Sequence, residues 1–503
     1  MFFVEGGKAA LTMTQQELEG YLWGAANLLR GVIDPGDYKS IIFPLMFFKR
    51  LSDVYGEEYE EALQTYGDEE SAKFSENHMF QIPDGSHWKD VRKTATNVGQ
   101  AIRTAIMNIE KANPDKLLGI FGDTNWANKD RLSDRILTDL IEHFSSISLT
   151  IKNVPQDEFG NAYEYLIKKF ADDSGHSAAE FYTNRTVVRL MTLIVDPQPG
   201  ESIYDPTCGS GGMLLNARLL VQEREKEFRT LKLYGQEINI ITSAIARMNM
   251  FIHGVQDFEI VQGDTLKRPA FIENGRVKQF DICIANPPYS MKKWDRESWK
   301  NDPLGRNIYG TPPQGAADYA FFQHIICSLK QDTGRCAILW PHGILFRDSE
   351  KEIRANLVES DCIDTIIGLG PNLFYNSPMD SCIVVCRKKK PETKKNKIMF
   401  IRAYDHIYKE GNKNFLSSEH VKNIFNWFSE FKEIPGRTKI ASIEEVRKNN
   451  YITNVALYAR PEYGNDNSEK PKIGSLAKDW SESSEQIKSS FIKLKVALEE
   501  IVK

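Results

Sequence analysis

The sequence has no arrangement of cysteine or histidine that indicates a metal site. Its seven cysteines include no pair at Cys-x-x-Cys spacing, and its nine histidines form no His-Glu-x-x-His pattern. An odd number of scattered cysteines is typical of reduced thiols, and several of them fall in apolar runs where cysteine acts as a small core residue. We therefore predict reduced thiols and no bound metal.

The sequence also lacks a long apolar segment and a surplus of basic residues. No apolar run reaches the roughly 18 residues that a membrane helix needs, and the first residues contain no basic leader. These absences predict a cytoplasmic protein that does not associate with membranes. The formal net charge is -5, so no overall positive field attracts nucleic acid. Any binding to DNA must use local patches or a partner.

The length of 503 residues is too great for one core and predicts two to four domains. Residues 1–170 are expected to form a helical N-terminal domain. Thr14-Gln15-Gln16-Glu17 is a capping box, and apolar residues recur after it at helical spacing. A later segment repeats the pattern, with Leu137, Leu140, Ile141 and Phe144. The polar stretch 171–177, which contains Gly and Ser, is predicted to be a linker.

Residues 178–410 alternate between short β-like runs and helical runs. The runs that read as strands are residues 202–204, 231–234, 258–261, 280–285, 336–340, 365–367 and 382–386. Helical patterns such as 213–226, 240–253 and 319–329 separate several of them. Alternation on this scale predicts an α/β fold with a doubly wound, parallel, Rossmann-like sheet.

The C-terminal region, residues 411–503, is charged and irregular until a final helical pattern. Its apolar positions repeat at spacings of four, three, four and three, at Ile487, Phe491, Leu494, Leu498 and Ile501. This amphipathic seam is too short to stand alone. It packs either on its own chain or on a partner.

Asn286-Pro287-Pro288-Tyr289 follows the buried strand predicted for residues 280–285. Proline cannot donate to a sheet ladder, so the strand ends here and a rigid turn presents Asn286 and Tyr289 at its carboxyl end. An amide oxygen and a backbone carbonyl can accept the two N–H bonds of a planar amine while an aromatic ring stacks on its plane. The turn therefore predicts transfer to an amine, but adenine, cytosine, an RNA base and a glutamine amide all fit it.

A glycine-rich turn lies upstream, between the strand at 202–204 and a helix. It comprises Asp205-Pro206-Thr207-Cys208-Gly209-Ser210-Gly211-Gly212, and its glycines let a ligand approach the backbone. The next strand ends at Glu237, where an open α/β sheet places the carboxylate that binds ribose hydroxyls. Asp264 follows the third strand and is a candidate contact to an adenine, or alternatively a helix cap.

The nature of the cofactor follows from patterns that are absent. The chain has no Gly-x-x-x-x-Gly-Lys-Ser/Thr motif, and its glycine spacing differs from the Gly-x-Gly-x-x-Gly of dinucleotide sites. An adenosine cofactor without a pyrophosphate remains. S-adenosylmethionine is that molecule, and its sulfonium methyl group is what a bound amine would attack.

Taken in order, these motifs resemble those of amino-methyltransferases that act on DNA adenine. The matching segments are Glu180-Phe181-Tyr182-Thr183, residues 205–212, Glu237, Asp264 and the Asn286 turn. The helical N-terminal part and Asp318-Tyr319-Ala320-Phe321 narrow the resemblance to the modification subunit of type I restriction-modification systems. In two places the chain departs from this family, with Asn184 where proline is usual and His342 where aspartate is common.

The resemblance implies roles for individual residues. The cofactor would be held by Glu180, Phe181, Tyr182, Thr183, Asn184, Arg185, Asp205, Gly209, Ser210, Gly211, Gly212, Glu237 and Asp264. Asn286, Pro287 and Tyr289 would bind and activate the N6 amine of an adenine flipped out of the duplex. Phe374 would cover the other face of that base, unless it is simply a core residue.

The resemblance also implies partners. A separate DNA-specificity subunit would read the target in double-stranded DNA, and the helix at 487–501 is a candidate for contacting it. Two modification subunits would bind each specificity subunit. The chain has no nucleotide-hydrolysis motif, so translocation and cleavage would belong to a restriction subunit. A non-catalytic scaffold in a defence complex is the alternative of a different class.

Two basic segments are candidates for contacting DNA phosphates. The first is the long loop 290–318, with Lys292, Lys293, Trp294 and Arg296. The second is the run 387–390 with Lys394, Lys395 and Lys397. A basic run after an edge strand is otherwise a solvated surface.

Overall fold

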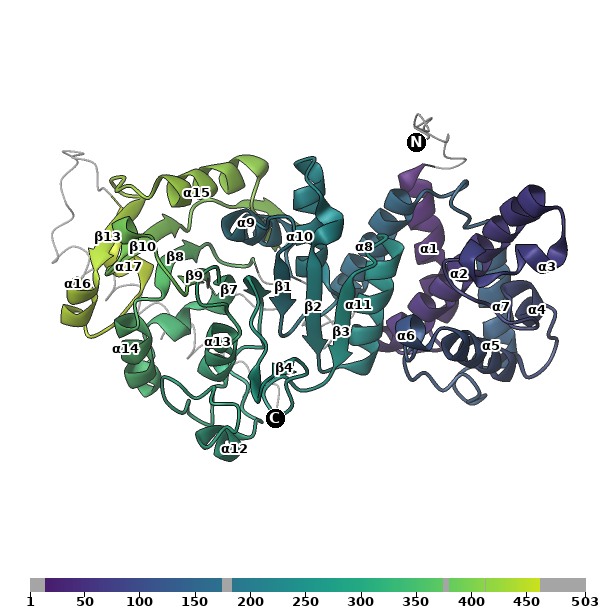
Figure 1. Cartoon of the computed structure of the whole chain (residues 1–503), viewed down its shortest axis with the longest axis horizontal. Coiled ribbons are helices and arrows are strands. Elements are labelled where there is room, and N and C mark those ends of the chain that lie inside the picture. Colours follow the sequence, from purple (N-terminus) through teal and green to yellow (C-terminus); the bar gives the residue numbers. More distant parts are fainter. Residues whose placement is uncertain (1–13, 174–182, 374–379, 412, 462–503) are drawn as a thin grey trace, which may run out of the picture. The chain divides into compact units, whose positions relative to one another are not determined.

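The structure, a computed structural model, describes residues 14–173, 183–373, 380–411 and 413–461 (Figure 1). The described residues up to Arg460 belong to one compact unit. None of the described helices is long and apolar enough to span a membrane. The predicted helix at 487–501 lies outside the described residues.

The N-terminal part is all-helical, as predicted. Its helices are α1 (Gln15–Leu29), α2 (Tyr38–Tyr66), α3 (Glu69–Ala72), α4 (Trp88–Arg92), α5 (Val98–Ala112), α6 (Pro114–Leu117), α7 (Asp134–Ser145) and α8 (Gln156–Asp173). The capping box at the start of α1 is present: the Thr14 hydroxyl accepts the Glu17 N–H, and the Glu17 carboxylate accepts the Thr14 N–H. The apolar faces of these helices form a common core.

Nine strands of the described residues form one sheet. In spatial order they are β13 (Thr438–Ser442), β10 (Lys397–Ala403), β8 (Ile363–Leu369), β9 (Ser381–Arg387), β7 (Arg335–Pro341), β6 (Ile282–Ala285), β1 (Ser202–Asp205), β2 (Lys232–Glu237) and β3 (Phe258–Gln262). The strands from β3 to β7 are parallel. β9 runs antiparallel to β7 and β8. A parallel return needs a crossover, usually a helix, and the described part of the β8–β9 connection contains none.

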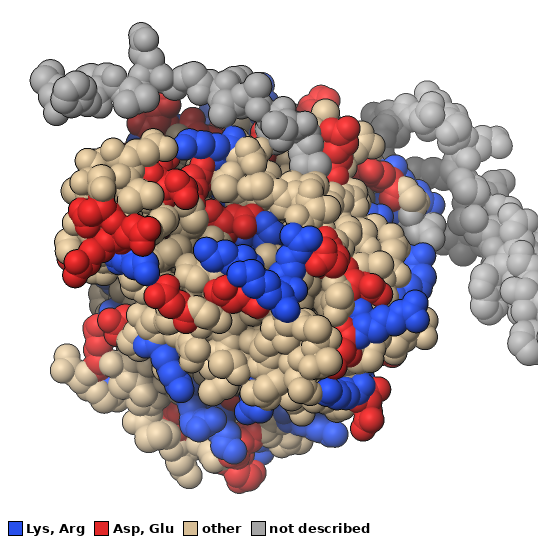
Figure 2. All heavy atoms as spheres, turned by 90° about the vertical axis from the view of Figure 1, so that its right-hand side faces the viewer, with Lys and Arg blue, Asp and Glu red and all other residues tan. Residues whose placement is uncertain are grey.

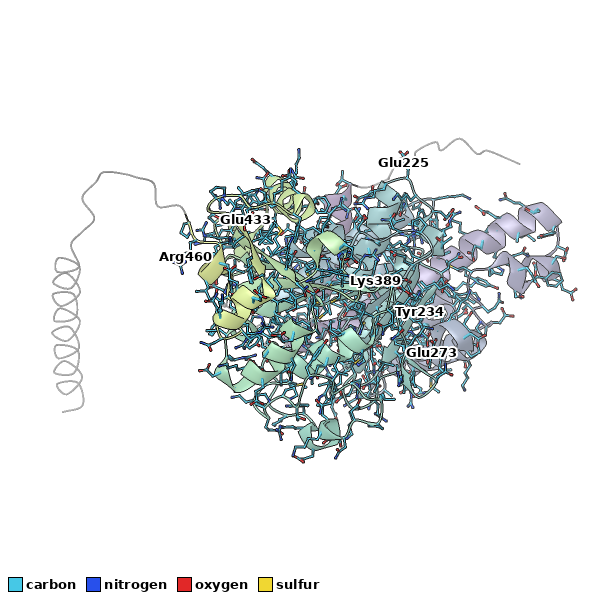
Figure 3. The ribbon with its side chains drawn as sticks, turned by 60° about the vertical axis from the view of Figure 1, so that its left-hand side comes forward. Glu225, Tyr234, Glu273, Lys389, Glu433 and Arg460 are labelled. Carbon is cyan, nitrogen blue, oxygen red and sulfur yellow. The ribbon has the colours of Figure 1, made fainter. Side chains whose placement is uncertain are left out.

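Helices cover both faces of the sheet, and side chains fill the space between the layers (Figure 3). One face packs against α9 (Arg185–Val195), α10 (Gly212–Glu223) and α15 (Ser418–Glu430). The other packs against α13 (Asp318–Cys327), α14 (Lys351–Glu359), α16 (Ile443–Lys448) and α17 (Val455–Tyr458). The remaining α-helices and strands are α11 (Ile240–Ile252), α12 (Arg296–Lys300) and two small hairpins, β4 (Ile272–Glu273) with β5 (Arg276–Val277) and β11 (Tyr408–Glu410) with β12 (Lys413–Phe415). The arrangement confirms the predicted α/β class.

The predicted boundary at 170 falls inside α8, and the one at 410 falls between the two strands of the β11–β12 hairpin. α8 continues to Asp173 and takes in the first residues of the predicted linker at 171–177, because its apolar side chains pack into the helical core. The boundary at 410 also separates β13 from the rest of its sheet, although β13 pairs with β10. α11 contributes apolar side chains to the helical core as well as to the sheet core, so the two parts share a packed surface.

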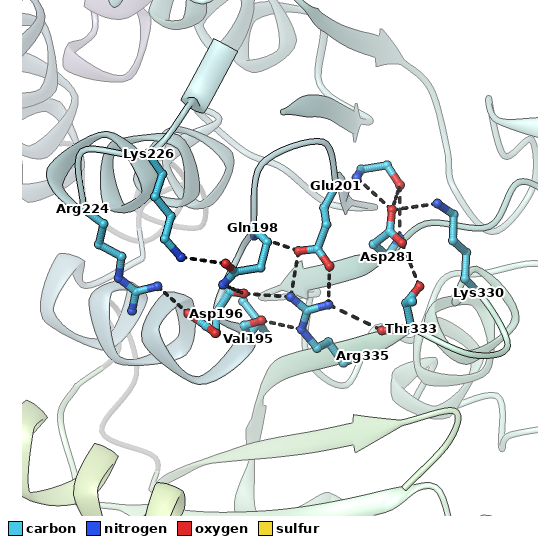
Figure 4. Close-up of polar contacts among 11 residues, drawn as sticks. Val195, Asp196, Gln198, Glu201, Arg224, Lys226, Asp281, Lys330, Thr333 and Arg335 are labelled. Atoms are coloured by element: carbon cyan, nitrogen blue, oxygen red, sulfur yellow. Dashed lines mark hydrogen bonds and ion pairs between the residues drawn. The ribbon is translucent and has the colours of Figure 1, made fainter. Parts of the chain in front are cut away.

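Arg335 forms a closed polar network where β7 begins (Figure 4). Its two terminal nitrogens donate to the two carboxylate oxygens of Glu201, each at 2.8 Å. The same guanidinium donates to the backbone carbonyls of Val195 and Asp196, at the end of α9. This network joins a strand to a helix and a loop at the amino edge of the sheet.

Asp281 is a second polar centre at the same edge, directly before β6 (Figure 4). Its carboxylate accepts from the Ser202 backbone N–H at 3.0 Å, the Lys330 ammonium at 2.7 Å and the Thr333 hydroxyl at 2.7 Å. Burial alone would raise the pKa of Asp281, but these hydrogen bonds lower it well below its ordinary value. The carboxylate is therefore ionised and neutralised by Lys330.

The basic run after β9 lies at this amino edge, because Arg387 is opposite Arg335 in the antiparallel pair. Acidic side chains neutralise most of the run: Arg387 and Lys394 pair with Asp364, Lys389 with Asp332, Lys390 with Asp361 and Lys395 with Glu392. Lys389 is labelled in Figure 3. The geometry thus favours a structural and solvated run over a surface that contacts DNA.

Candidate active site at the carboxyl edge

The predicted site residues gather where the winding of the sheet reverses. From β1 the chain builds β2 and β3 on one side, and later β6 and β7 on the other. Such a switch point is where open α/β sheets bind ligands, beyond the carboxyl ends of the strands. The Asn286 turn follows β6, the glycine loop follows β1, and Glu237 ends β2. Three adjacent strands therefore carry the three predicted motifs.

Two neighbouring side chains orient the amide of Asn286. Its Nδ2 donates to the Thr183 hydroxyl at 3.0 Å, and its Oδ1 accepts from the Tyr289 hydroxyl. Among the described residues, none donates a hydrogen bond to the carbonyl oxygen of Pro287. An amide oxygen and a backbone carbonyl are thus present in the same rigid turn.

Tyr289 packs beneath the turn. Its ring centroid lies 6.5 Å from that of Trp340, which is fully buried at the end of β7 and stacks on Phe322 of α13. Burial raises the pKa of Tyr289 well above its ordinary value, so the hydroxyl stays protonated and donates to Asn286.

Asp318 fixes the residue that follows the turn. Ser290 adopts a positive φ of 48° and its N–H donates to the Asp318 carboxylate at 3.0 Å. Arg347 donates to the other oxygen of Asp318 at 2.8 Å and also pairs with Glu350. In the sequence, only the family resemblance pointed to Asp318, and no motif pointed to Arg347. The local pattern gives no signal for either contact, because the partners are far apart in the chain.

The glycine loop folds back tightly on its strands. Gly209 and Gly211 have positive φ values of 53° and 78°. A methyl group added at Gly211 would lie 2.7 Å from the end of the Met250 side chain, so the loop approaches α11 closely. The loop is held to β2 by the Cys208 N–H, which donates to the Gln236 carbonyl at 2.9 Å. The turn between β1 and α10 therefore carries few side chains that would keep a ligand away from its backbone.

Glu237 and Asp205 are buried carboxylates on either side of this loop. Glu237 accepts the Gly209 N–H at 3.1 Å and the Asn239 N–H at 2.9 Å, and Asp205 accepts the Thr207 N–H at 3.0 Å. Burial raises the pKa of Asp205 to about 8 and also raises the pKa of Glu237. The charge of Lys39 lowers the pKa of Glu237, but by less than burial raises it.

Asp264 caps the turn after β3, in line with the second of the two roles predicted for it, that of a cap. Its Oδ1 accepts the backbone N–H groups of Leu266 and Lys267 at 2.9 and 3.1 Å. The neighbouring Thr265 hydroxyl donates to the Pro206 carbonyl at 2.6 Å and so joins this turn to the glycine loop. The capping bonds use one carboxylate oxygen of Asp264 and leave the other for a ligand.

The departures at Asn184 and His342 have separate structural accounts. Asn184 is buried at the N-cap of α9, where its Oδ1 accepts the Thr186 N–H and its Nδ2 donates to the Asn414 carbonyl. Both polar ends of its side chain are therefore held within the protein. His342 packs edge-on against Tyr404, and burial lowers its pKa.

Several predicted positions lie outside the described residues, namely Glu180, Phe181, Tyr182 and Phe374. Thr183 and Arg185, at the other end of the same segment, are described. Arg185 lies against the glycine loop, since a methyl group at Gly212 would come within 1.9 Å of its guanidinium. Among the described residues, no group of three or more His, Cys, Asp or Glu side chains could hold a metal ion.

The residues present fit S-adenosylmethionine. Two buried carboxylates whose pKa values are raised by burial suit ribose hydroxyls and a positively charged cofactor. The apolar side chains of Ile238 and Ile240, next to Glu237, are 60% and 45% exposed and could pack on an adenine ring. No sequence motif pointed to these isoleucines, and the signal that could have found them is their place just after Glu237 at the end of a predicted strand.

Comparison with known proteins identifies the family. Residues 154–467 match the N-6 DNA Methylase family, and residues 18–144 match the HsdM N-terminal domain. The MjaVII type I restriction enzyme methylase subunit of Methanocaldococcus jannaschii is 31% identical over 476 residues, covering 90% of this chain and 79% of that protein. The MpnII methylase subunit of Mycoplasma pneumoniae is 28% identical, covering 90% of each chain.

A solved structure shows the same fold. It is the methyltransferase subunit of a type I restriction-modification system from Streptococcus thermophilus, with a TM-score of 0.78 and 29% identity. The match covers 89% of this chain and all of that one. By fold, motifs and sequence, the chain belongs to the N-6 DNA methylase family, among the methylase subunits of type I restriction enzymes.

Proposed function

We propose that this chain uses the Asn286 turn to methylate the N6 amine of an adenine that has been flipped out of DNA. The observation that carries the proposal is the juxtaposition of this turn with the glycine loop and Glu237 on three adjacent strands. Amine acceptors and a cofactor cradle thus meet at one edge of the sheet.

Membership of the family confirms the predicted reaction class, which is methyl transfer from S-adenosylmethionine to adenine N6 in DNA. When bound, the cofactor supplies an electrophilic methyl group. The protein must therefore hold the amine in line with that group and exclude competing water.

Asn286 and Pro287 would accept the two hydrogens of the amine. The lone pair of an exocyclic adenine amine is delocalised into the ring, and two acceptors bias the nitrogen towards tetrahedral geometry. Thr183 supports this role because it receives the Asn286 Nδ2–H and so directs Oδ1 away from itself. No strong base is needed before attack.

Tyr289 would stack on the flipped base and release Asn286 when the base arrives. Its hydroxyl now donates to the Asn286 Oδ1, the atom that the amine would need. A base must leave the duplex to present its amine to this turn, and an aromatic face offsets part of the lost stacking. Phe374 remains a prediction for the other face.

Glu237 would accept from the ribose hydroxyls, and the glycine loop would lie along the cofactor. Each Glu237 oxygen accepts one backbone N–H, which leaves a lone pair on each for a hydroxyl. We assign Asn184 to supporting α9 rather than to cofactor contact, because its amide is already bonded at both ends. Glu180, Phe181 and Tyr182 remain predicted cofactor contacts.

Lys292 and Lys293 are the proposed phosphate contacts near the turn. Both are exposed, and neither has an acidic partner among the described residues. The Gln314 amide donates to the Lys292 carbonyl at 2.9 Å and to the Trp294 carbonyl at 3.1 Å, which fixes this segment. By contrast, the face over the N-terminal helices in Figure 2 mixes acidic and basic side chains and offers no continuous basic surface.

The subunit would act within a larger assembly. The relatives are named as subunits of type I restriction enzymes, which supports partners that supply target recognition and cleavage. We propose two copies of this chain per specificity subunit, with residues 485–503 contacting it. Deleting 485–503 should abolish co-purification with that subunit, and intact assembly would show that the segment has only a local role.

Sequencing for modified bases tests the function directly. DNA from cells that carry the gene should contain N6-methyladenine at a defined sequence, and DNA from cells without it should not. Methylation of cytosine would instead support the alternative of an N4-cytosine enzyme. No modification, together with no binding of radiolabelled cofactor, would support a non-catalytic scaffold.

A further inference from the structure

Glu164 lies on α8, outside the motifs of the site, yet both of its carboxylate oxygens are bound by residues of the cofactor region. Oε1 accepts from the side-chain amide of Asn249 at 2.8 Å. Oε2 forms an ion pair with Arg185. The side chain is only 20% exposed, so solvent screens these contacts little.

Asn249 carries one contact from Glu164 to the glycine loop. It is fully buried on α11, and its Nδ2 donates to the Ser210 carbonyl at 3.0 Å as well as to Glu164. One amide group therefore bridges the carboxylate and the loop backbone. Without the Glu164 carboxylate, the Asn249 amide would lose one of the two contacts that fix its orientation towards the loop.

Arg185 carries the second contact. Its guanidinium lies so close to Gly212 that a methyl group there would come within 1.9 Å. Arg185 begins α9 two residues after Thr183, whose hydroxyl receives the Asn286 amide. The ion pair with Glu164 thus fixes the far end of the glycine loop and the start of α9 together.

We propose that Glu164 is a positioning residue that couples the helical N-terminal part to the cofactor loop. α8 is anchored in the helical core by Phe159, Tyr163 and Leu166, and the Tyr163 hydroxyl donates to the Ile245 carbonyl of α11. Displacement of α8 would move the carboxylate and relax the C-terminal part of the loop, at Ser210 and Gly212. The inference rests on the proposed function in that it takes this loop to hold S-adenosylmethionine.

Glu164→Gln tests the coupling in the full-length chain. An amide of the same size cannot accept from both partners, so the dissociation constant for S-adenosylmethionine should rise about tenfold, as expected for one charge-assisted hydrogen bond. KM for the cofactor should rise in parallel, while kcat at saturating cofactor changes less than about twofold, because Asp318 holds the Asn286 turn separately. Asp157→Asn is the matched control, since it removes an exposed carboxylate from the same helix.

Two further measurements keep the proposal falsifiable. Backbone amides of residues 209–212 should exchange hydrogen faster in Glu164→Gln than in the wild type and Asp157→Asn. If Glu164→Gln does not fold, Glu164→Asp keeps the charge with a shorter reach and should give a smaller rise in the dissociation constant. Unchanged affinity and unchanged exchange in a folded variant would overturn the proposal. A wild-type chain that binds no S-adenosylmethionine would instead contradict the proposed function.

Discussion

Polar side chains at the two ends of strand β6 differ in whether they are paired with opposite charges. Asp281, before the strand, is ionised and paired with Lys330, and Arg335 beside it is saturated by Glu201 and two carbonyls. After the strand comes Asn286. On the neighbouring strands of that edge, Asp205 and Glu237 are buried carboxylates that receive only backbone N–H groups from the described residues.

We infer from this difference that the paired groups stabilise the fold and that the buried carboxylates are suited to binding a ligand. A charge that is paired and hydrogen-bonded when buried stabilises the folded chain or at least leaves it unharmed. A carboxylate whose pKa is raised by burial favours the binding of hydrogen-bond donors or positive charge. The amino edge is thus assigned to stability and the carboxyl edge to binding and chemistry.

Asn286→Ala should give the largest effect of these variants, and the effect should be on the rate of methyl transfer alone. Loss of a preorganised acceptor should lower kcat by about 10³-fold or more, which corresponds to about 4 kcal/mol of barrier. The melting temperature and the affinity for S-adenosylmethionine should remain close to those of the wild type. Radiolabelled methyl transfer to DNA measures kcat, and calorimetry measures the melting temperature and the affinity. Normal kcat in this variant would remove Asn286 from the mechanism.

Arg335→Ala should give the complementary result at the amino edge. Its removal leaves Glu201 half-buried without its partner and should lower the free energy of unfolding by about 3 kcal/mol. kcat per folded molecule should not change. Denaturant unfolding measures the loss, and Lys389→Ala is a control because its pair with Asp332 is exposed. Equal stability of the two variants would contradict the assignment of this edge.

Asp281 and Asp205 should give pH dependences of opposite sign. The lowered pKa of Asp281 means that its stabilisation is complete above about pH 4, its unfolded value, and is lost as pH falls towards the folded value. The pKa of Asp205, raised to about 8, means that ionisation destabilises the fold increasingly as pH rises from about 4 to about 8.

Asparagine substitutions separate these two contributions. Asp281→Asn should lower stability at pH 7 by about 1–2 kcal/mol and flatten its fall in acid. Asp205→Asn should instead reduce the decline of stability between about pH 4 and about pH 8. Unfolding curves across this range measure both. Slopes that change in the same direction would show that the two edges do not differ in this way.

The lysines give the smallest effect. Replacing Lys292 and Lys293 by alanine should reduce the slope of log affinity against log salt by about one to two, with DNA affinity a few-fold lower. Stability should be unaffected. Lys389→Ala, at the amino edge, should leave the slope unchanged. Filter binding over a salt series decides between them, and equal effects of all three lysines would indicate a diffuse surface.

The carboxyl edge was predictable from sequence because its signals are local. A proline pair ends β6, glycines with positive φ follow β1, and the acidic residue that ends β2 is visible beside its strand. The strands themselves were found by short apolar runs between helical patterns. Parallel connectivity then places these three turns at one edge without further information.

The amino edge and the supports of the site were not predictable, because their partners are distant in sequence. Arg335 meets Glu201 across 134 positions, and Ser290 meets Asp318 across 28. The basic run after β9 read as a possible DNA contact because its acidic partners Asp332, Asp361 and Asp364 come from other elements. Strands β10 and β13 were both missed: β10 lies in the segment after Lys390 that read as charged and irregular, and β13 is short and carries polar residues at an edge of the sheet.

The rise in melting temperature on adding S-adenosylmethionine is the most direct test of the division between the edges. Ligand binding to the folded chain raises its stability by mass action. Arg335→Ala should melt below the wild type but keep the full rise with cofactor, and Glu237→Ala, whatever its own melting temperature, should lose most of the rise. The opposite outcome, in which Arg335→Ala loses the rise and Glu237→Ala keeps it, would contradict the account.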